Sequence, residues 1–143
     1  MKKTVISTAS WKGGMRVDAK ARNHEVIVDQ PEAGGGKDAG ANPMEYLLFA
    51  FGGCLGAVAA IIADQEKINL TAFDVSLEGD YDPANLFGMT DEGRAGFTEI
   101  RVNVKIEADI TDEEKQAFFE RVDARCPLSD NLINTTKIVF AVA

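Results

Sequence analysis

The first part of the chain alternates apolar and charged positions, as expected of strands with one buried face. Over residues 15–22, every odd position is apolar and every even position is charged, which is the period of a half-buried strand. A second strand is expected over residues 25–29, whose middle residues 26–28 are apolar, and Trp11 with Gly13-Gly14 indicates a further strand. We therefore predict three short strands, followed by a glycine-rich loop over residues 30–41.

The next segment, residues 46–63, contains 18 residues without a charge. Asn42, Pro43 and Glu45 fit the N-cap, the first and the third position of a helix, so Glu45 can return a hydrogen bond to the cap. The run approaches the ~20 residues that cross a bilayer, but its three glycines and the acidic residues near both ends favour a helix buried inside a protein. Because one chain of this size has too few strands to cover such a helix on every side, we predict a homodimer with the glycines at the helix–helix contact.

Alternation returns in the second half of the chain. Residues 100–107 are the clearest strand, since Ile and Val alternate there with polar residues. Thr111 and Glu114 have the spacing of a capping box, and Pro127 ends the helix that follows at about Cys126. We also expect a strand over 73–78, a loop over 80–96 and a last strand over 137–142. Three strands, a buried helix, two strands, a surface helix and a strand predict an α+β fold with a single domain over residues 1–143.

Charge and composition exclude several classes of function. The net charge of −8 repels phosphates, so nucleic acid and anionic membranes are not expected as partners. No apolar run of signal-peptide length follows the first lysines, and we expect a cytoplasmic protein. His24 is the single histidine, too few ligands for a closed zinc site. We therefore expect no metal and no other cofactor.

The two cysteines are the candidate functional residues. In a reducing compartment they are free thiols or a pair that cycles. Cys54 lies in the apolar helix, where a cysteine usually packs as a small hydrophobic residue. Cys126 lies at a helix end before a proline, where a thiol is often accessible. Because a nearby arginine lowers the pKa of a thiol and activates it as a nucleophile, Arg16, Arg22 and Arg125 are the candidate supporting residues.

Several segments resemble the OsmC/Ohr family, the osmotically inducible and organic hydroperoxide resistance proteins. They are Trp11-Lys12-Gly13-Gly14, residues 40–48, Gly52-Gly53-Cys54 and Arg125-Cys126-Pro127-Leu128. The resemblance, closest to the OsmC-like branch, implies an intertwined homodimer whose antiparallel sheets wrap around two long central helices. It also implies that Cys54 attacks an organic hydroperoxide and that Cys126 resolves the sulfenic acid as a disulfide. Dithiols, lipoylated proteins among them, would then reduce the disulfide.

One position departs from the hydroperoxide-reducing branch, in which a glutamate directly after the proline orients the supporting arginine. Here that position is Met44, and Glu45 lies nine residues before Cys54, on the opposite side of an ideal helix. We therefore interpret Glu45 as a cap, with Arg16 as the first candidate for the supporting arginine and Arg22 as the second. The alternative function is a non-catalytic or redox-sensing OsmC-like protein that binds a small apolar ligand at the dimer interface.

Overall fold

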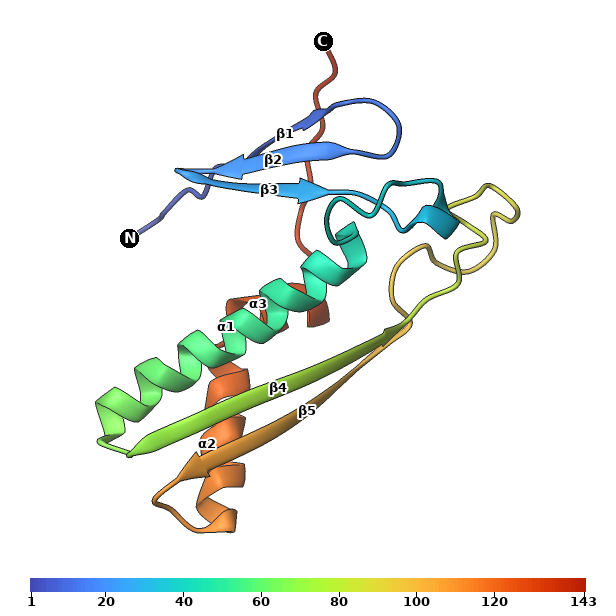
Figure 1. Cartoon of the computed structure of the whole chain (residues 1–143). Helices are drawn as coiled ribbons and strands as arrows, with labels where there is room; N and C mark the ends of the chain where they lie inside the picture. Colours follow the sequence, from blue (N-terminus) through green and yellow to red (C-terminus); the bar gives the residue numbers. More distant parts are fainter. The chain divides into compact units, whose positions relative to one another are not determined.

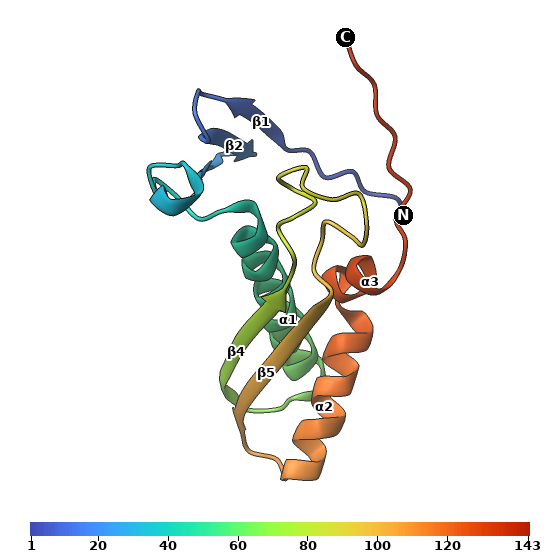
Figure 2. The same ribbon diagram turned by 90° about the vertical axis from the view of Figure 1, so that its right-hand side faces the viewer.

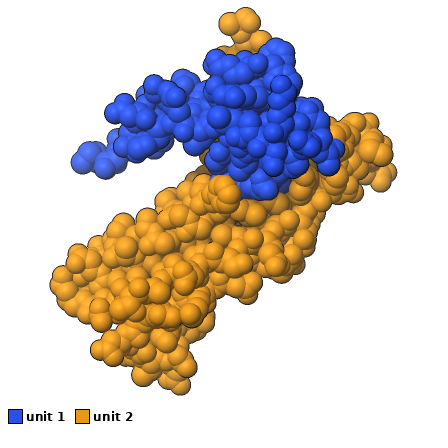
Figure 3. Space-filling view, viewed as in Figure 1, with its two compact units in different colours: residues 1–47 blue, residues 48–143 orange.

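The computed structural model describes all 143 residues of the chain (Figure 1). The chain divides into two compact units, residues 1–47 and residues 48–143 (Figure 3). The secondary structure is mixed α+β, with two antiparallel sheets, as the alternation predicted. The expectation of a single domain over residues 1–143 stays a prediction.

The first unit contains a three-stranded antiparallel sheet in the order β1-β2-β3. Its strands are β1 (Thr8–Trp11), β2 (Val17–Ala21) and β3 (His24–Val28), which confirms the three strands predicted for this region. The turn between β1 and β2 needs the glycine pair, because Gly13 and Gly14 have φ values of 100° and 56° that other residues rarely adopt. A short 3-10 helix, η1 (Glu32–Gly34), interrupts the glycine-rich loop.

The long helix α1 (Pro43–Glu66) begins where the sequence places its cap. Glu45 N donates to Asn42 Oδ1 at 2.9 Å, and Asn42 N donates to Glu45 Oε2 at 2.8 Å. This reciprocal pair satisfies two of the backbone N–H groups that a helix start leaves free. Glu45 is therefore a capping residue, as we interpreted it.

The second unit adds a two-stranded antiparallel hairpin of β4 (Leu70–Asp80) and β5 (Glu99–Ala108). Next in the chain is α2 (Asp112–Arg125), which opens with the predicted capping box, and then α3 (Pro127–Ile133). In Figure 2, α1 and α2 lie on the same side of the β4–β5 hairpin, and apolar side chains of these elements form one core. Four fully buried side chains form the centre of this core: Leu55, Ile62, Phe118 and Val122.

One side of α1 faces this core and the other is uncovered, so the predicted burial on all sides is not reached within one chain. Phe49 is 62% exposed and Ile61 is 49% exposed. The helix is long and apolar enough to span a bilayer, with a mean hydropathy of 2.2 over its most apolar window. Core helices of soluble proteins meet the same criterion, so length and composition do not separate the two cases.

Two predictions at the end of the chain were wrong. Residues 137–142 form no strand, and Phe140, the largest side chain among them, is 86% exposed. A strand requires a neighbour to pair its backbone groups, and this segment has none in the single chain. The helix α3 was missed because we interpreted Pro127 as a stop signal, whereas it occupies the first turn of a new helix.

Candidate active site

The core-facing half of α1 carries Cys54 beside the buried residues Phe51 and Leu55. The Cys54 side chain is half-buried and packs against the core cluster. One turn of the helix lies very close to β4, because a Cβ atom at Gly52 would lie 2.9 Å from Leu77 Cδ1. The glycine therefore allows the hairpin to approach the helix next to the thiol.

The second thiol, Cys126, lies at the corner between α2 and α3. Its backbone is extended, with φ −79° and ψ 112°, and it serves as C-cap of α2 and N-cap of α3. Its side chain is 1% exposed. Cys126 Sγ accepts a hydrogen bond from Ser129 N at 3.4 Å, which is how an N-cap side chain satisfies a free N–H group of the first turn.

The structure brings the two thiols into contact although they are 72 residues apart in sequence. Cys126 Sγ donates a hydrogen bond to Cys54 Sγ across 3.1 Å, and both cysteines are free. Because the sulfur atoms of a disulfide lie about 2.05 Å apart, closing a bond requires them to approach by about 1 Å. The pair is therefore placed for reversible disulfide formation.

The surroundings of the two sulfur atoms differ. Burial raises the pKa of the Cys126 thiol, the hydrogen bond from Ser129 N opposes that change, and the contact with Cys54 adds to it. Cys126 therefore remains a protonated thiol at neutral pH, with its S–H directed at Cys54. Cys54 is the more exposed of the two, so a molecule from solvent reaches Cys54 first.

Comparison with protein families agrees with the fold. A model of the family described as OsmC-like protein matches residues 34–141, which include α1 and both cysteines. The chain belongs to the OsmC-like family. No curated protein sequence gives a significant match to it.

Solved OsmC-like structures share the architecture at low sequence identity. An OsmC-like protein from Mycoplasma pneumoniae has a TM-score of 0.82 and 21% identity, with 94% of this chain and 91% of that one covered. An organic hydroperoxide resistance protein from Elizabethkingia anophelis has a TM-score of 0.68 and 22% identity over 94% and 91%. An OsmC-like protein of unknown function from Vibrio cholerae has a TM-score of 0.74 and 11% identity over 90% and 93%. These likenesses establish the OsmC-like fold.

The arginines expected to support the thiolate of this OsmC-like chain are placed as follows. Arg16 lies in the first unit, where it donates two hydrogen bonds to Asp18 at 2.7 and 3.2 Å. This contact raises the pKa of Arg16 and lowers that of Asp18. Arg22, also in the first unit, has a φ of 55° in the tight turn between β2 and β3. A role of either arginine at Cys54 stays a prediction.

Arg125 precedes Cys126 directly, yet its side chain is engaged elsewhere. Arg125 Nη1 donates to Gln65 Oε1, near the end of α1, at 2.9 Å. The pKa of Cys126 is raised by burial and by Cys54 and lowered by backbone N–H groups, and Arg125 has no part in it. Arg125 therefore helps to fasten α2 to α1 and is not a partner of the thiol.

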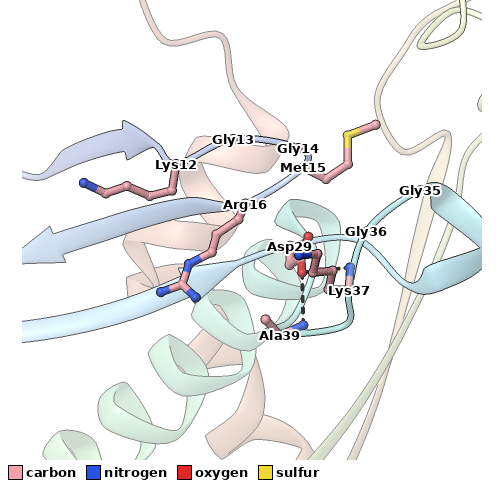
Figure 4. Close-up of a pocket in the computed structure, with 10 residues that line it drawn as sticks. All are labelled: Lys12, Gly13, Gly14, Met15, Arg16, Asp29, Gly35, Gly36, Lys37 and Ala39. Atoms are coloured by element: carbon pink, nitrogen blue, oxygen red, sulfur yellow. Dashed lines mark hydrogen bonds between the residues drawn. The ribbon is translucent and has the colours of Figure 1, made fainter.

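A pocket of about 300 Å³ lies within the first unit, between the β1–β2 turn and the glycine-rich loop (Figure 4). Asp29, at its edge, is 2% exposed. Its carboxylate accepts hydrogen bonds from the N–H groups of Gln30, Lys37 and Ala39 at 2.9, 3.1 and 3.1 Å. These bonds, above all the one from Ala39, hold the pKa of Asp29 below its usual range. The carboxylate thus fixes the loop that leads into α1.

Sequence reasoning missed Asp29 and the partners of Cys126. An aspartate directly before a glycine-rich loop is a known acceptor for nearby backbone N–H groups, so Asp29 carried a signal that we did not use. Ser129 and Asp123 carried none, because their hydrogen bond crosses a helix corner that we did not predict.

Proposed function

We propose that the protein is a thiol-dependent peroxide reductase that uses Cys54 and Cys126 and acts on organic hydroperoxides. The observation that carries the proposal is the 3.1 Å contact between the two free sulfur atoms. A thiol pair at this distance converts two-electron oxidation of one sulfur into a disulfide with little movement. Membership of the OsmC-like family, and the fold shared with a protein described as an organic hydroperoxide resistance protein, support it.

The reaction has two steps in this chain. The Cys54 thiolate attacks one peroxide oxygen, the O–O bond breaks, and the other oxygen takes a proton and leaves as the alcohol. Cys54 sulfur is oxidised by two electrons to the sulfenic acid. Cys126 sulfur then attacks Cys54 sulfur, the hydroxyl group leaves with the Cys126 proton as water, and the disulfide forms. An external dithiol, free or carried by a lipoylated protein, reduces that disulfide by thiol exchange.

The division of roles follows from exposure. Cys54 is half-buried and accepts the hydrogen bond of the Cys126 thiol, which stabilises the negative charge that a nucleophile carries. Cys126 is 1% exposed and is therefore protected from direct reaction with peroxide. The apolar side chains around Cys54 favour the organic part of a hydroperoxide, so an organic hydroperoxide should be consumed faster than hydrogen peroxide.

A homodimer completes the proposal. In one chain, added Cβ atoms at Gly53 and Gly56 meet no atom within 4 Å, and Phe49 lies exposed on the same helix. A second copy of α1 would cover this side, since small residues let two backbones approach closely. A partner strand would likewise pair the apolar segment 137–142. We retain Arg16 as the proposed supporting residue and the reducing cytoplasm as the proposed location.

Mass spectrometry after a stoichiometric pulse of cumene hydroperoxide tests the proposed function. We expect one intramolecular Cys54–Cys126 disulfide in the wild type and a persistent sulfenic acid on Cys54 in the Cys126→Ser variant. Cys54→Ser should abolish peroxide consumption. Unchanged thiols in the wild type would contradict the proposal. Unchanged binding of an apolar ligand by Cys54→Ser would then favour the non-catalytic alternative.

A further inference from the structure

The corner that carries Cys126 is fastened by a hydrogen bond between two residues with no assigned role. Ser129 Oγ donates to Asp123 Oδ1 at 2.6 Å. Ser129 is 4% exposed, whereas Asp123 is exposed at the end of α2. A hydrogen bond to a carboxylate is shorter and about twice as strong as one between neutral groups. This pair is called the clasp below.

The clasp acts on the same residue that contacts the Cys126 sulfur. While Ser129 Oγ is held by Asp123, Ser129 N donates to Cys126 Sγ at 3.4 Å. The backbone closes the same ring, because Cys126 N donates to the carbonyl oxygen of Asp123 at 3.0 Å. The position of the N–H group relative to the sulfur therefore depends on where Asp123 holds the serine.

The short helix α3 cannot hold this orientation by itself. It has 7 residues, fewer than a helix needs for stability without tertiary contacts. Its other side-chain hydrogen bonds stay within α3 or reach the residues that follow it, as Asn131 does with Pro127 and Thr136. Within α2 itself, Asp123 is the one residue whose side chain forms a hydrogen bond to α3.

We propose that Asp123 is a positioning residue for Cys126: through Ser129 it holds the N–H donor against the Cys126 sulfur and so sets the rate at which Cys126 closes the disulfide with Cys54. When Cys126 attacks, its sulfur loses a proton and gains negative charge, which an aligned N–H group stabilises. Burial of Cys126 opposes that charge, so the N–H donor matters most in this step. The inference rests on the proposed function for its biological meaning, because disulfide closure is the second step of that reaction.

The attack of Cys126 can be measured without peroxide by use of Ellman's reagent. Cys54 reacts first, releases one aryl thiolate and retains the other as a mixed disulfide. Cys126 then attacks Cys54 sulfur, the Cys54–Cys126 disulfide forms, and the second aryl thiolate leaves as the proton of Cys126 passes to solvent. The first release reports Cys54 and the second reports Cys126 in the same sample.

We expect Asp123→Ala to leave the first release unchanged and to slow the second about tenfold, at the lower end of what a hydrogen bond to a charged group contributes. Asp123→Asn retains an acceptor for Ser129 without the charge, and should restore most of the rate. Ser129→Ala should match Asp123→Ala, and the double variant should be no slower than either, since both remove one bond. Asp130→Ala is the matched control, because its carboxylate binds Asn134.

A second release at the wild-type rate in Asp123→Ala, or equal slowing in Asp130→Ala, would overturn the inference. Circular dichroism of each variant identifies any loss of fold, and Ser129→Ala, which removes the same hydrogen bond from the other side, keeps the test decisive if Asp123→Ala unfolds. The two proposals fail separately. If the wild-type thiols do not react with hydroperoxide but the second release still depends on Asp123, then the proposed peroxide reductase function is wrong and the positioning role of Asp123 stands.

Discussion

Replacement of Gly53 by alanine should stabilise a chain that acts alone but weaken the association of a homodimer. Gly53 lies on the exposed side of α1, and an added Cβ atom meets no other atom within 4 Å. Alanine is favoured over glycine inside a helix by about 1 kcal/mol. In a solitary chain, Gly53→Ala should therefore raise the free energy of unfolding by about 1 kcal/mol.

In the proposed homodimer the same methyl group is forced into the contact between two α1 helices. Overpacking costs about 1–3 kcal/mol at one site, and a two-fold symmetric dimer contains the site twice. The dimer should lose about 2–6 kcal/mol of association free energy. Since about 1.4 kcal/mol corresponds to a factor of ten, Kd should rise by roughly 30-fold to 2 × 10⁴-fold.

Sedimentation equilibrium of the wild type and Gly53→Ala over a range of concentrations measures this Kd. Denaturant unfolding at two concentrations provides a second readout, because the stability of a dimer depends on concentration. Ala117→Gly, on the exposed side of α2, is the control: it should cost about 1 kcal/mol and leave Kd unchanged. An unaltered Kd together with a more stable Gly53→Ala variant would refute a helix–helix contact at Gly53.

Three further substitutions test the fold that supports the site. Asp29→Asn should lower Tm at neutral pH. Backbone hydrogen bonds hold the pKa of Asp29 in the folded protein below the ordinary value of 3.8. The ionised carboxylate therefore stabilises the fold above pH 3.8, and this stabilisation is lost as the pH falls through the pKa of the folded state. Thermal unfolding from pH 7 to pH 3 should therefore show the wild-type and Asp29→Asn curves converging in acid. Phe118→Ala, at a side chain that is 0% exposed, should cost about 3–5 kcal/mol in urea unfolding. Thr111→Ala should cost about 1 kcal/mol in the same assay, because it removes the capping bond of α2.

The elements that the sequence predicted well are those whose own side chains decide them. Residues 100–107 alternate without a break, and β5 covers them with one extra residue at each end. Thr111 and Glu114 bond to each other's backbone, so the start of α2 needs no distant contact. In both cases the pattern and the structure describe the same short stretch of chain.

Residues 137–142 show where this reasoning ends. Their apolar character indicates that they are buried in the functional protein, but the sequence pattern does not identify the segment that packs against them. A strand exists only with a neighbour, and in one chain these residues have none. The same applies to α1. Its uniformly apolar sequence predicted burial on every side, whereas a single chain buries only one side of the helix. Both gaps concern surfaces that belong to a partner in the proposed assembly, and for that reason neither could be resolved from one chain.

The contact between the two thiols could not be predicted from the residues alone, because it depends on how the helices pack. Spacing along the sequence says nothing about a 3.1 Å contact across 72 residues; it arises because α2 packs against α1 through Phe118 and Val122. The helix corner then decides the chemistry of Cys126. An N-cap is usually Ser, Thr, Asp or Asn, and sulfur accepts hydrogen bonds only weakly. A cysteine at this cap therefore gains little stability from it, which is the expected compromise if this capping position also carries the proposed resolving thiol.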